Sequence, residues 1–220
     1  MIALNKVSNS LSATAREPPL PVKRPGASNA RKKILDVSTR LFAKHGFDAV
    51  TMRQISKESG LSMPSIYHHF GNKEDLFKAV ETEMYSAHAQ TLLHEIQSDA
   101  STEERLRKFI VAMFERLDSN PDYLKLLQRN LVDGWEENQA FLVELSLQGV
   151  VDELKLLLNQ YSPGKGNGIT PVAIFSMILG FVTMSPVIRH LKGEQIAAFT
   201  GNNRAAFVEV VIDFIKSSKH

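Results

Sequence analysis

The 220-residue sequence is 43% hydrophobic and 23% charged, and it contains no cysteine. This composition supplies enough apolar material for one sizeable globular domain or two modest ones. The lack of cysteine excludes disulfides, thiolate zinc sites and cysteine nucleophiles, so we expect a chain that works in the reducing cytoplasm.

Charge is divided unevenly along the chain. Residues 1–80 contain 13 Lys and Arg against 6 Asp and Glu, whereas residues 81–220 contain 13 against 18. A basic first third indicates contact with a polyanion such as nucleic acid, although a solvated charged face has the same signature.

The first 28 residues are rich in Pro, Ser and Asn, and we expect them to form a flexible arm. Basic residues in and just after this arm are candidates for phosphate or minor-groove contacts. They are Lys23, Arg24, Arg31, Lys32 and Lys33. From residue 29 onward helical periodicity dominates, which predicts an all-α fold.

The basic third is predicted to hold three helices. An amphipathic helix runs from residue 29 to a C-cap at Gly46, and two short helices follow, with Thr51 and Ser62 as N-caps and Gly60 in the turn between them. Two short helices joined by such a turn are the sequence form of a helix-turn-helix. Asn72 is expected to cap a long helix that leads into the rest of the chain.

Three interpretations compete for Tyr67, His68 and His69, which the second short helix cannot hide. A zinc pair is disfavoured because adjacent histidines point about 100° apart on a helix and no Cys or carboxylate stands at the right spacing. A catalytic histidine would need a partner carboxylate or serine elbow, and the sequence shows neither. A helix end that touches nucleic acid fits best, because the first turn of a recognition helix reaches base edges while flanking groups hold phosphates.

The stretch "KKILDVSTRLFAKHGFDAVTMRQISKESGLSMPSIYHHFGNKEDLF" resembles the DNA-binding domain of the TetR family of transcriptional regulators, over residues 29–80. The resemblance implies base contacts from Arg53 and the positions from Met63 to His68. It implies backbone contacts from Thr51, Tyr67, His69 and Lys73. The full expected DNA-binding set is Thr51, Arg53, Ser62, Met63, Pro64, Ser65, Tyr67, His68, His69 and Lys73. Met63 and His68 depart from the commonest family residues, so the operator cannot be taken from a relative.

Residues 81–220 are predicted to form a helical effector-binding and dimerisation domain. Further helices are expected near 103–119, 121–133, 136–160, 169–191 and 203–217. The loop 162–168 contains several glycines but follows no strand and lacks the closing residues of a phosphate loop, so we interpret it as a mobile connection.

The last helix is apolar nearly all round, more than its own chain can cover, which predicts a two-fold interface between copies of the chain. The expected interface residues are Phe207, Val210, Val211 and Phe214. The resemblance implies the same homodimer, and a dimer presents two recognition helices to an inverted-repeat operator. Residues 169–188 carry no charge and are just long enough to span a membrane, but Pro171 and Pro186 and the absence of an aromatic belt favour a soluble helix.

The resemblance also implies a cavity for a small effector among the middle helices, about residues 84–190. Aromatic and thioether side chains suit an apolar effector, although each is more often a core residue. The candidates are Met84, Tyr85, His88, Met113, Phe114, Trp135, Phe141 and Phe181. We therefore expect a repressor that a small apolar molecule releases from DNA, with no cofactor and no metal. A ligand-binding protein with a vestigial head and an all-α enzyme are the alternatives; the intact Arg53, Tyr67 and Lys73 set opposes the first, and the lack of convergent acid and base groups opposes the second.

Overall fold

The computed structural model describes residues 25–188, 190 and 204–217, and this part of the chain is built from helices. The all-α prediction is confirmed. Expected features in residues 1–24, including Lys23 and Arg24, lie outside the described residues, as do positions 189, 191 and 203 at the predicted helix ends.

Three helices form a head at one end of the molecule: α1 (Pro25–His45), α2 (Met52–Ser59) and α3 (Met63–Phe70). The helix α1 begins four residues before the predicted start, because a proline is tolerated in the first turn, where its missing N–H has no helical partner. Ile34, Phe42, Ile55 and Ile66 are fully buried and form the core of the head. This apolar centre holds α2 and α3 against α1.

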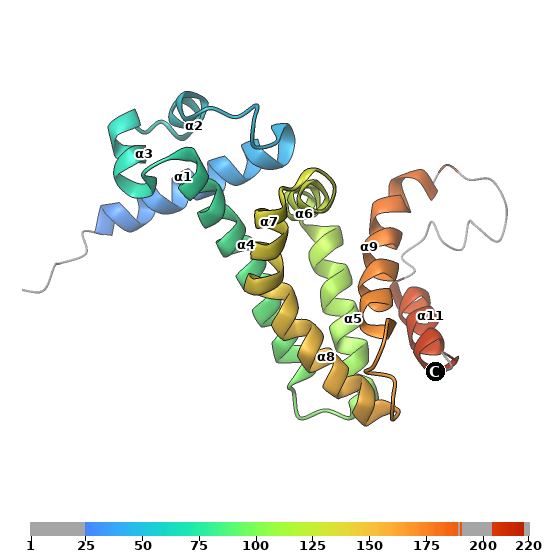
Figure 1. Ribbon diagram of the computed structural model, residues 1–220. Coiled ribbons are helices and arrows are strands. Elements are labelled where there is room, and N and C mark those ends of the chain that lie inside the picture. Colours follow the sequence, from blue (N-terminus) through green and yellow to red (C-terminus); the bar gives the residue numbers. More distant parts are fainter. Residues whose placement is uncertain (1–24, 189, 191–203, 218–220) are drawn as a thin grey trace, which may run out of the picture.

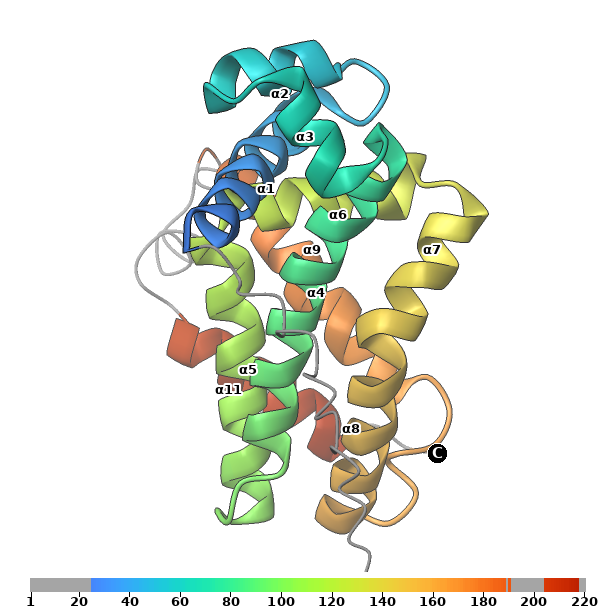
Figure 2. The same cartoon turned by 90° about the vertical axis from the view of Figure 1, so that its left-hand side faces the viewer.

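The long helix α4 (Lys73–Ile96) leaves the head and runs through the body (Figure 1). Beside it lie α5 (Thr102–Ser119) and α6 (Pro121–Asp133), and α8 (Gln148–Tyr161) packs against both α4 and α5 (Figure 2). The helices α9 (Thr170–Ile188) and α11 (Arg204–Ser217) pack on the side of α5 away from α4 (Figure 1). One helix, α4, therefore belongs to the head and to the body at once.

The predicted helix 136–160 is interrupted. It consists of α7 (Glu136–Leu142), a π-helical segment at Val143–Leu147 and α8. A π-helical segment inserts an extra residue into the helical repeat, and such segments are frequent at functional sites. Here the segment forms part of a cavity wall.

The loop 162–168, predicted to be a mobile connection, is hydrogen-bonded to the end of α8. The side-chain oxygen of Asn159 accepts hydrogen bonds from the backbone N–H groups of Gly164 and Gly166, at 3.1 and 3.0 Å. Gly164 has a φ of 88°, a conformation that L side chains rarely adopt. The glycines therefore serve a tight turn capped by Asn159.

Candidate nucleic-acid interface and ligand cavity

The head contains a helix-turn-helix whose ends are fixed by the predicted caps. The hydroxyl of Thr51 accepts from the N–H of Gln54 at 3.2 Å, and that of Ser62 accepts from the N–H of Ser65 at 3.4 Å. Gly60 ends α2 with a φ of 65°, a left-handed conformation that glycine adopts without strain. These local contacts set the angle at which α3 leaves the turn.

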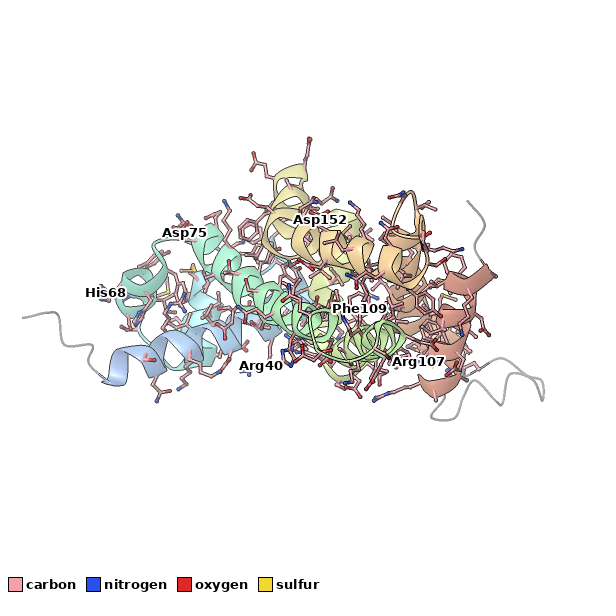
Figure 3. All side chains as sticks on the ribbon, turned by 90° about the horizontal axis from the view of Figure 1, so that it is seen from below. Arg40, His68, Asp75, Arg107, Phe109 and Asp152 are labelled. Carbon is pink, nitrogen blue, oxygen red and sulfur yellow. The ribbon has the colours of Figure 1, made fainter. Side chains whose placement is uncertain are left out.

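One face of α3 is buried and the other is open. Ile66 and Phe70 point into the head, whereas Tyr67 is 46% exposed and His68 is exposed at the end of the molecule (Figure 3). The remaining expected contact residues of α2 and α3 differ in exposure, and Met63 packs partly against the apolar core. Thr51, Arg53, Ser62 and Pro64 are exposed, and Met63, Ser65 and His69 are half-buried. The structure thus brings this predicted set to the surface of one motif.

The metal interpretation of the histidines gains no support from geometry. The rings of His68 and His69 have centroids 5.6 Å apart and meet edge to face. Within the described ranges, no three His, Asp or Glu side chains lie together in a way that could hold a metal ion.

Lys73 is placed differently from a free phosphate-binding lysine. Its ammonium donates to the carbonyl oxygen of Val50 at 2.9 Å and to that of Asp48 at 3.4 Å, and it lies 4.2 Å from the centre of the Phe47 ring. Two of its three donors are therefore occupied by the loop before α2. Lys73 therefore ties the start of α4 to that loop, and one of its donors is left for a phosphate.

The N-terminus of α4 is also less open to a phosphate than expected. The side-chain oxygen of Asn72 accepts from the N–H of Asp75 at 2.7 Å, which confirms the predicted cap. Glu74 and Asp75 place two carboxylates in the first turn. These carboxylates complement the helix dipole and repel an incoming anion.

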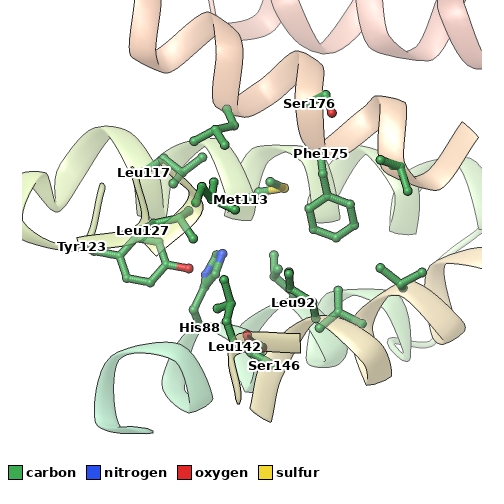
Figure 4. Close-up of a pocket in the computed structure, with 17 residues that line it drawn as sticks. His88, Leu92, Met113, Leu117, Tyr123, Leu127, Leu142, Ser146, Phe175 and Ser176 are labelled. Carbon is green, nitrogen blue, oxygen red and sulfur yellow. Dashed lines mark hydrogen bonds between the residues drawn. The ribbon is translucent and has the colours of Figure 1, made fainter. Parts of the chain in front are cut away.

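A cavity of about 280 Å³ lies in the body, enclosed by α4, α5, α6, the α7–α8 region and α9 (Figure 4). Its wall is mostly aliphatic. The lining residues are His88, Ala89, Leu92, Met113, Leu117, Tyr123, Leu127, Leu131, Leu142, Ser146, Leu147, Val150, Val151, Val172, Phe175, Ser176 and Leu179. The π-helical segment contributes to this wall through Ser146 and Leu147.

Two of the eight expected effector residues, His88 and Met113, line this cavity, and the other six do not. Phe114 and Phe181 pack with Phe207 of α11, at ring distances of 5.7 Å between the first two and 4.3 Å between the last two. Met84 and Tyr85 are buried, and Phe141 is half-buried. These aromatic and thioether groups pack against their neighbours and do not face the cavity. The prediction could not separate the two roles, because a core residue and a cavity residue have the same sequence pattern. The aliphatic wall residues that the prediction missed carried no distinguishing signal for the same reason.

Trp135, also expected in the cavity, lies at the seam between head and body. Its ring meets the Phe47 ring edge to face at 5.1 Å, and it is 50% exposed. Close by, the Arg129 guanidinium donates to the carbonyl oxygens of Ala43 and Lys44, at 3.3 and 3.2 Å. Arg129 therefore caps the C-terminus of α1, where a cation is favourable.

A buried carboxyl group lies in the same seam. Glu81 of α4 is 1% exposed and accepts a hydrogen bond from the side-chain amide of Asn130 of α6 at 2.8 Å, while its other oxygen has no partner among the described residues. Burial raises the pKa of Glu81 to about 7, against the opposing effects of Asn130 and Lys78. A carboxyl in this position is mostly protonated below neutral pH.

His88 forms a polar point in the cavity wall. It is 8% exposed, its Nδ1 has no hydrogen-bond partner in the part of the chain that the structure describes, and its ring centroid lies 5.0 Å from that of Tyr123. Burial, aided by the charge of Arg116, lowers the pKa of His88 to about 4. The imidazole is therefore neutral at physiological pH.

An apolar surface runs along α9 and α11. Val172, Met184 and Val187 of α9 are about half exposed, and so is Val210 of α11. Of the other expected interface residues, Phe207 and Val211 are buried within the chain and Phe214 is half-buried. In length and composition α9 could cross a membrane, and 22% of its apolar window is buried within the chain. Within residues 25–188, 190 and 204–217, no segment covers these exposed side chains of α9.

The N-terminal part of the chain matches a known family. Residues 34–80 match the family model described as "Bacterial regulatory proteins, tetR family". The chain is 27% identical over 179 residues to the uncharacterized HTH-type transcriptional regulator YerO of Bacillus subtilis, a match that covers 77% of this chain and 61% of the relative. It is 41% identical over 64 residues to the HTH-type transcriptional repressor AcnR of Corynebacterium efficiens, covering 29% of this chain and 34% of that repressor. The matches therefore span less than two thirds of these curated relatives.

Solved structures resemble the chain over most of its length. The FadR regulator of Bacillus subtilis, solved in complex with stearoyl-CoA, superposes with a TM-score of 0.67 at 21% identity, covering 86% of this chain and 99% of FadR. The fatty acid degradation regulator FadR of Bacillus halodurans gives a TM-score of 0.66 at 19% identity, covering 89% and 97%. At these identities the likeness shows the fold.

Proposed function

We propose that this chain, which belongs to the TetR family of bacterial regulatory proteins, is a site-specific DNA-binding transcriptional repressor. The observation that carries the proposal is the open face of α3, where Tyr67 and His68 project from a helix whose caps and core are fully formed. Such a helix places side chains of its first turn in the major groove. Its relatives are named as transcriptional regulators and repressors, which favours a regulator over an enzyme.

The regulator would act as a homodimer on an inverted-repeat operator. The apolar sides of α9 and α11 provide a surface that a second copy can cover, with Val210 and Val172 among its exposed residues. An isologous interface of this kind sets the two recognition helices about one DNA turn, roughly 34 Å, apart. We prefer this cover to a membrane because the adjoining α11 carries charged residues, among them Arg204 and Lys216.

A small apolar effector would release the protein from DNA. The cavity lies between helices that also touch the head: Leu127 and Leu131 of α6 line it, while Arg129 of the same helix binds the end of α1. An effector that prefers one position of α6 thereby shifts the populations of head positions. In this assignment residues 29–80 form the DNA-binding unit and residues 81–220 form the effector-binding and dimerisation unit.

The proposal further includes a cytoplasmic location and the complete expected DNA-contact set. Arg31, Lys32 and Lys33, which lie just after the first turn of α1, would also contact the DNA backbone. Lys32 is engaged with Asp36 at 3.0 Å, an exposed pair that a phosphate can replace at small cost.

The test is selection of a random duplex DNA pool on the purified protein at moderate salt, followed by sequencing of the retained molecules. Enrichment of an inverted repeat supports the proposal. Tyr67→Ala should abolish the enrichment, whereas Lys155→Ala, a change at a half-buried position of α8 in the body, should leave it intact. Retention of DNA without a sequence motif, lost as salt rises, would reduce the head to a non-specific polyanion binder.

A further inference from the structure

The cavity wall contains no charged side chain among the residues that the structure describes. Its polar members are His88, Tyr123, Ser146 and Ser176. The wall therefore favours a ligand whose enclosed part is uncharged and largely aliphatic, because an ionised group enclosed without a counter-charge or hydrogen bonds is costly.

The polar members are not equivalent. The hydroxyl of Ser146 already donates to the carbonyl oxygen of Leu142 at 3.1 Å, and Ser176 is exposed. His88 and Tyr123, by contrast, are both buried, and the Tyr123 hydroxyl points toward the imidazole (Figure 4). With no partner for the Nδ1 of His88, this pair has hydrogen-bonding capacity that the described chain leaves unused.

The pair is also electrically neutral. Burial lowers the pKa of His88 to about 4 and raises the pKa of Tyr123 above its usual value. A neutral imidazole offers one donor and one acceptor, and a phenol can do both. The guanidinium of Arg116 stacks over the Tyr123 ring at 4.9 Å, and Arg116 is not part of the cavity wall. It therefore cannot form an ion pair inside the cavity without a rearrangement.

We propose that the effector is an uncharged, chain-like aliphatic molecule with one hydroxyl or carbonyl group, and that His88, with Tyr123, determines specificity by binding that group. The inference rests on the proposed function in so far as the ligand is called an effector. The volume of about 280 Å³ lies near the lower end of small-molecule pockets, which fits a short or medium chain.

The test measures ligand binding to the full-length chain without DNA. Displacement of the neutral fluorophore N-phenyl-1-naphthylamine would be followed with 1-hexanol to 1-decanol, 1-chlorooctane and octanoate at pH 8, and calorimetry with 1-octanol would serve as a direct check. Affinity should rise about fourfold per methylene until the chain outgrows the cavity. The alcohol should bind about fivefold to tenfold more tightly than the chloride of equal length, and at least tenfold more tightly than the carboxylate.

Variants separate recognition from packing. His88→Leu should bring the affinities for 1-octanol and 1-chlorooctane to the same value, and His88→Gln, which keeps a neutral hydrogen-bonding group, should retain part of the preference. Thr91→Ala, an exposed change on the same helix as His88 but outside the cavity wall, should keep all of it. Equal or tighter binding of octanoate, an alcohol preference that survives in His88→Leu, or no binding of 1-octanol by calorimetry would overturn the inference.

The outcome is distinguishable from failure of the proposed function. Alcohol binding with the expected His88 dependence in a protein that selects no operator would leave the ligand assignment intact and reject the regulator. Operator selection without alcohol binding would reject the ligand assignment and leave the regulator intact.

Discussion

Replacing Glu81 with Gln tests the buried carboxyl in the seam between head and body. The pKa of Glu81 is raised from an ordinary value of 4.5 to about 7. Between pH 4.5 and pH 7 the folded chain therefore holds a proton that the unfolded chain has released. Stability from this group is therefore present below pH 4.5 and is lost as pH rises to 7, at about 1.4 kcal/mol per pH unit. Over this window the loss is about 3 kcal/mol, and Glu81→Gln should remove it.

The wild-type curve alone would hide this effect, because His88 acts in the opposite direction. The pKa of His88 is lowered from 6.5 to about 4, so its stability contribution is lost as pH falls through that window, also by about 3 kcal/mol. The two slopes nearly cancel between pH 4.5 and 6.5. Glu81→Gln should expose the histidine slope, and His88→Leu should expose the carboxyl slope.

The assay is urea unfolding at fixed protein concentration between pH 4.5 and 8, with Glu83→Gln as an exposed control on the same helix. Glu81→Gln should be close to wild type at pH 4.5 and about 3 kcal/mol more stable at pH 8, while the control should stay within about 0.5 kcal/mol of wild type throughout. Parallel curves for wild type and Glu81→Gln across this range would refute the burial argument.

Three further changes test the tie, the seam and the interface. Lys73→Ala should lower the free energy of unfolding by about 1–2 kcal/mol, because two backbone carbonyls lose their donor, and should flatten the salt dependence of DNA affinity by about one unit; unchanged unfolding would show that the tie contributes nothing. Arg129→Ala should keep the affinity for 1-octanol within about twofold of wild type but weaken the effect of 1-octanol on operator affinity. Fluorescence anisotropy of labelled DNA measures that affinity. Full retention of the effect would exclude α6 as the coupling element. Val210→Glu should shift the protein toward monomer in sedimentation, because it places a charge in the proposed interface. Val132→Glu, the same substitution at an exposed valine of α6, should not. A dimer that tolerates Val210→Glu would place the interface elsewhere.

Local features of the head could be predicted from sequence because each depends on residues a few positions apart. The caps at Thr51, Ser62 and Asn72 each join a side chain to a backbone N–H three residues later. The inward direction of Ile66 and Phe70 follows from the i, i+4 repeat. Such contacts form within one helical turn, so the pattern of residues specifies them.

Other features depended on contacts between residues far apart in the sequence, which the order of residues does not display. The tie from Lys73 to Val50 spans 23 residues, the Glu81–Asn130 bond spans 49, and the contact from Arg129 to Ala43 spans 86. Each arises only when helices pack. The cavity is the clearest case: an apolar residue at helical spacing faces the interior whether the space before it is filled or empty. By itself, therefore, the sequence determined the helices and the helix-turn-helix motif. Tertiary packing decided which residues line the cavity, where Lys73 and Trp135 are engaged, and which buried groups hold their protons, because burial and long-range proximity exist only in the folded chain.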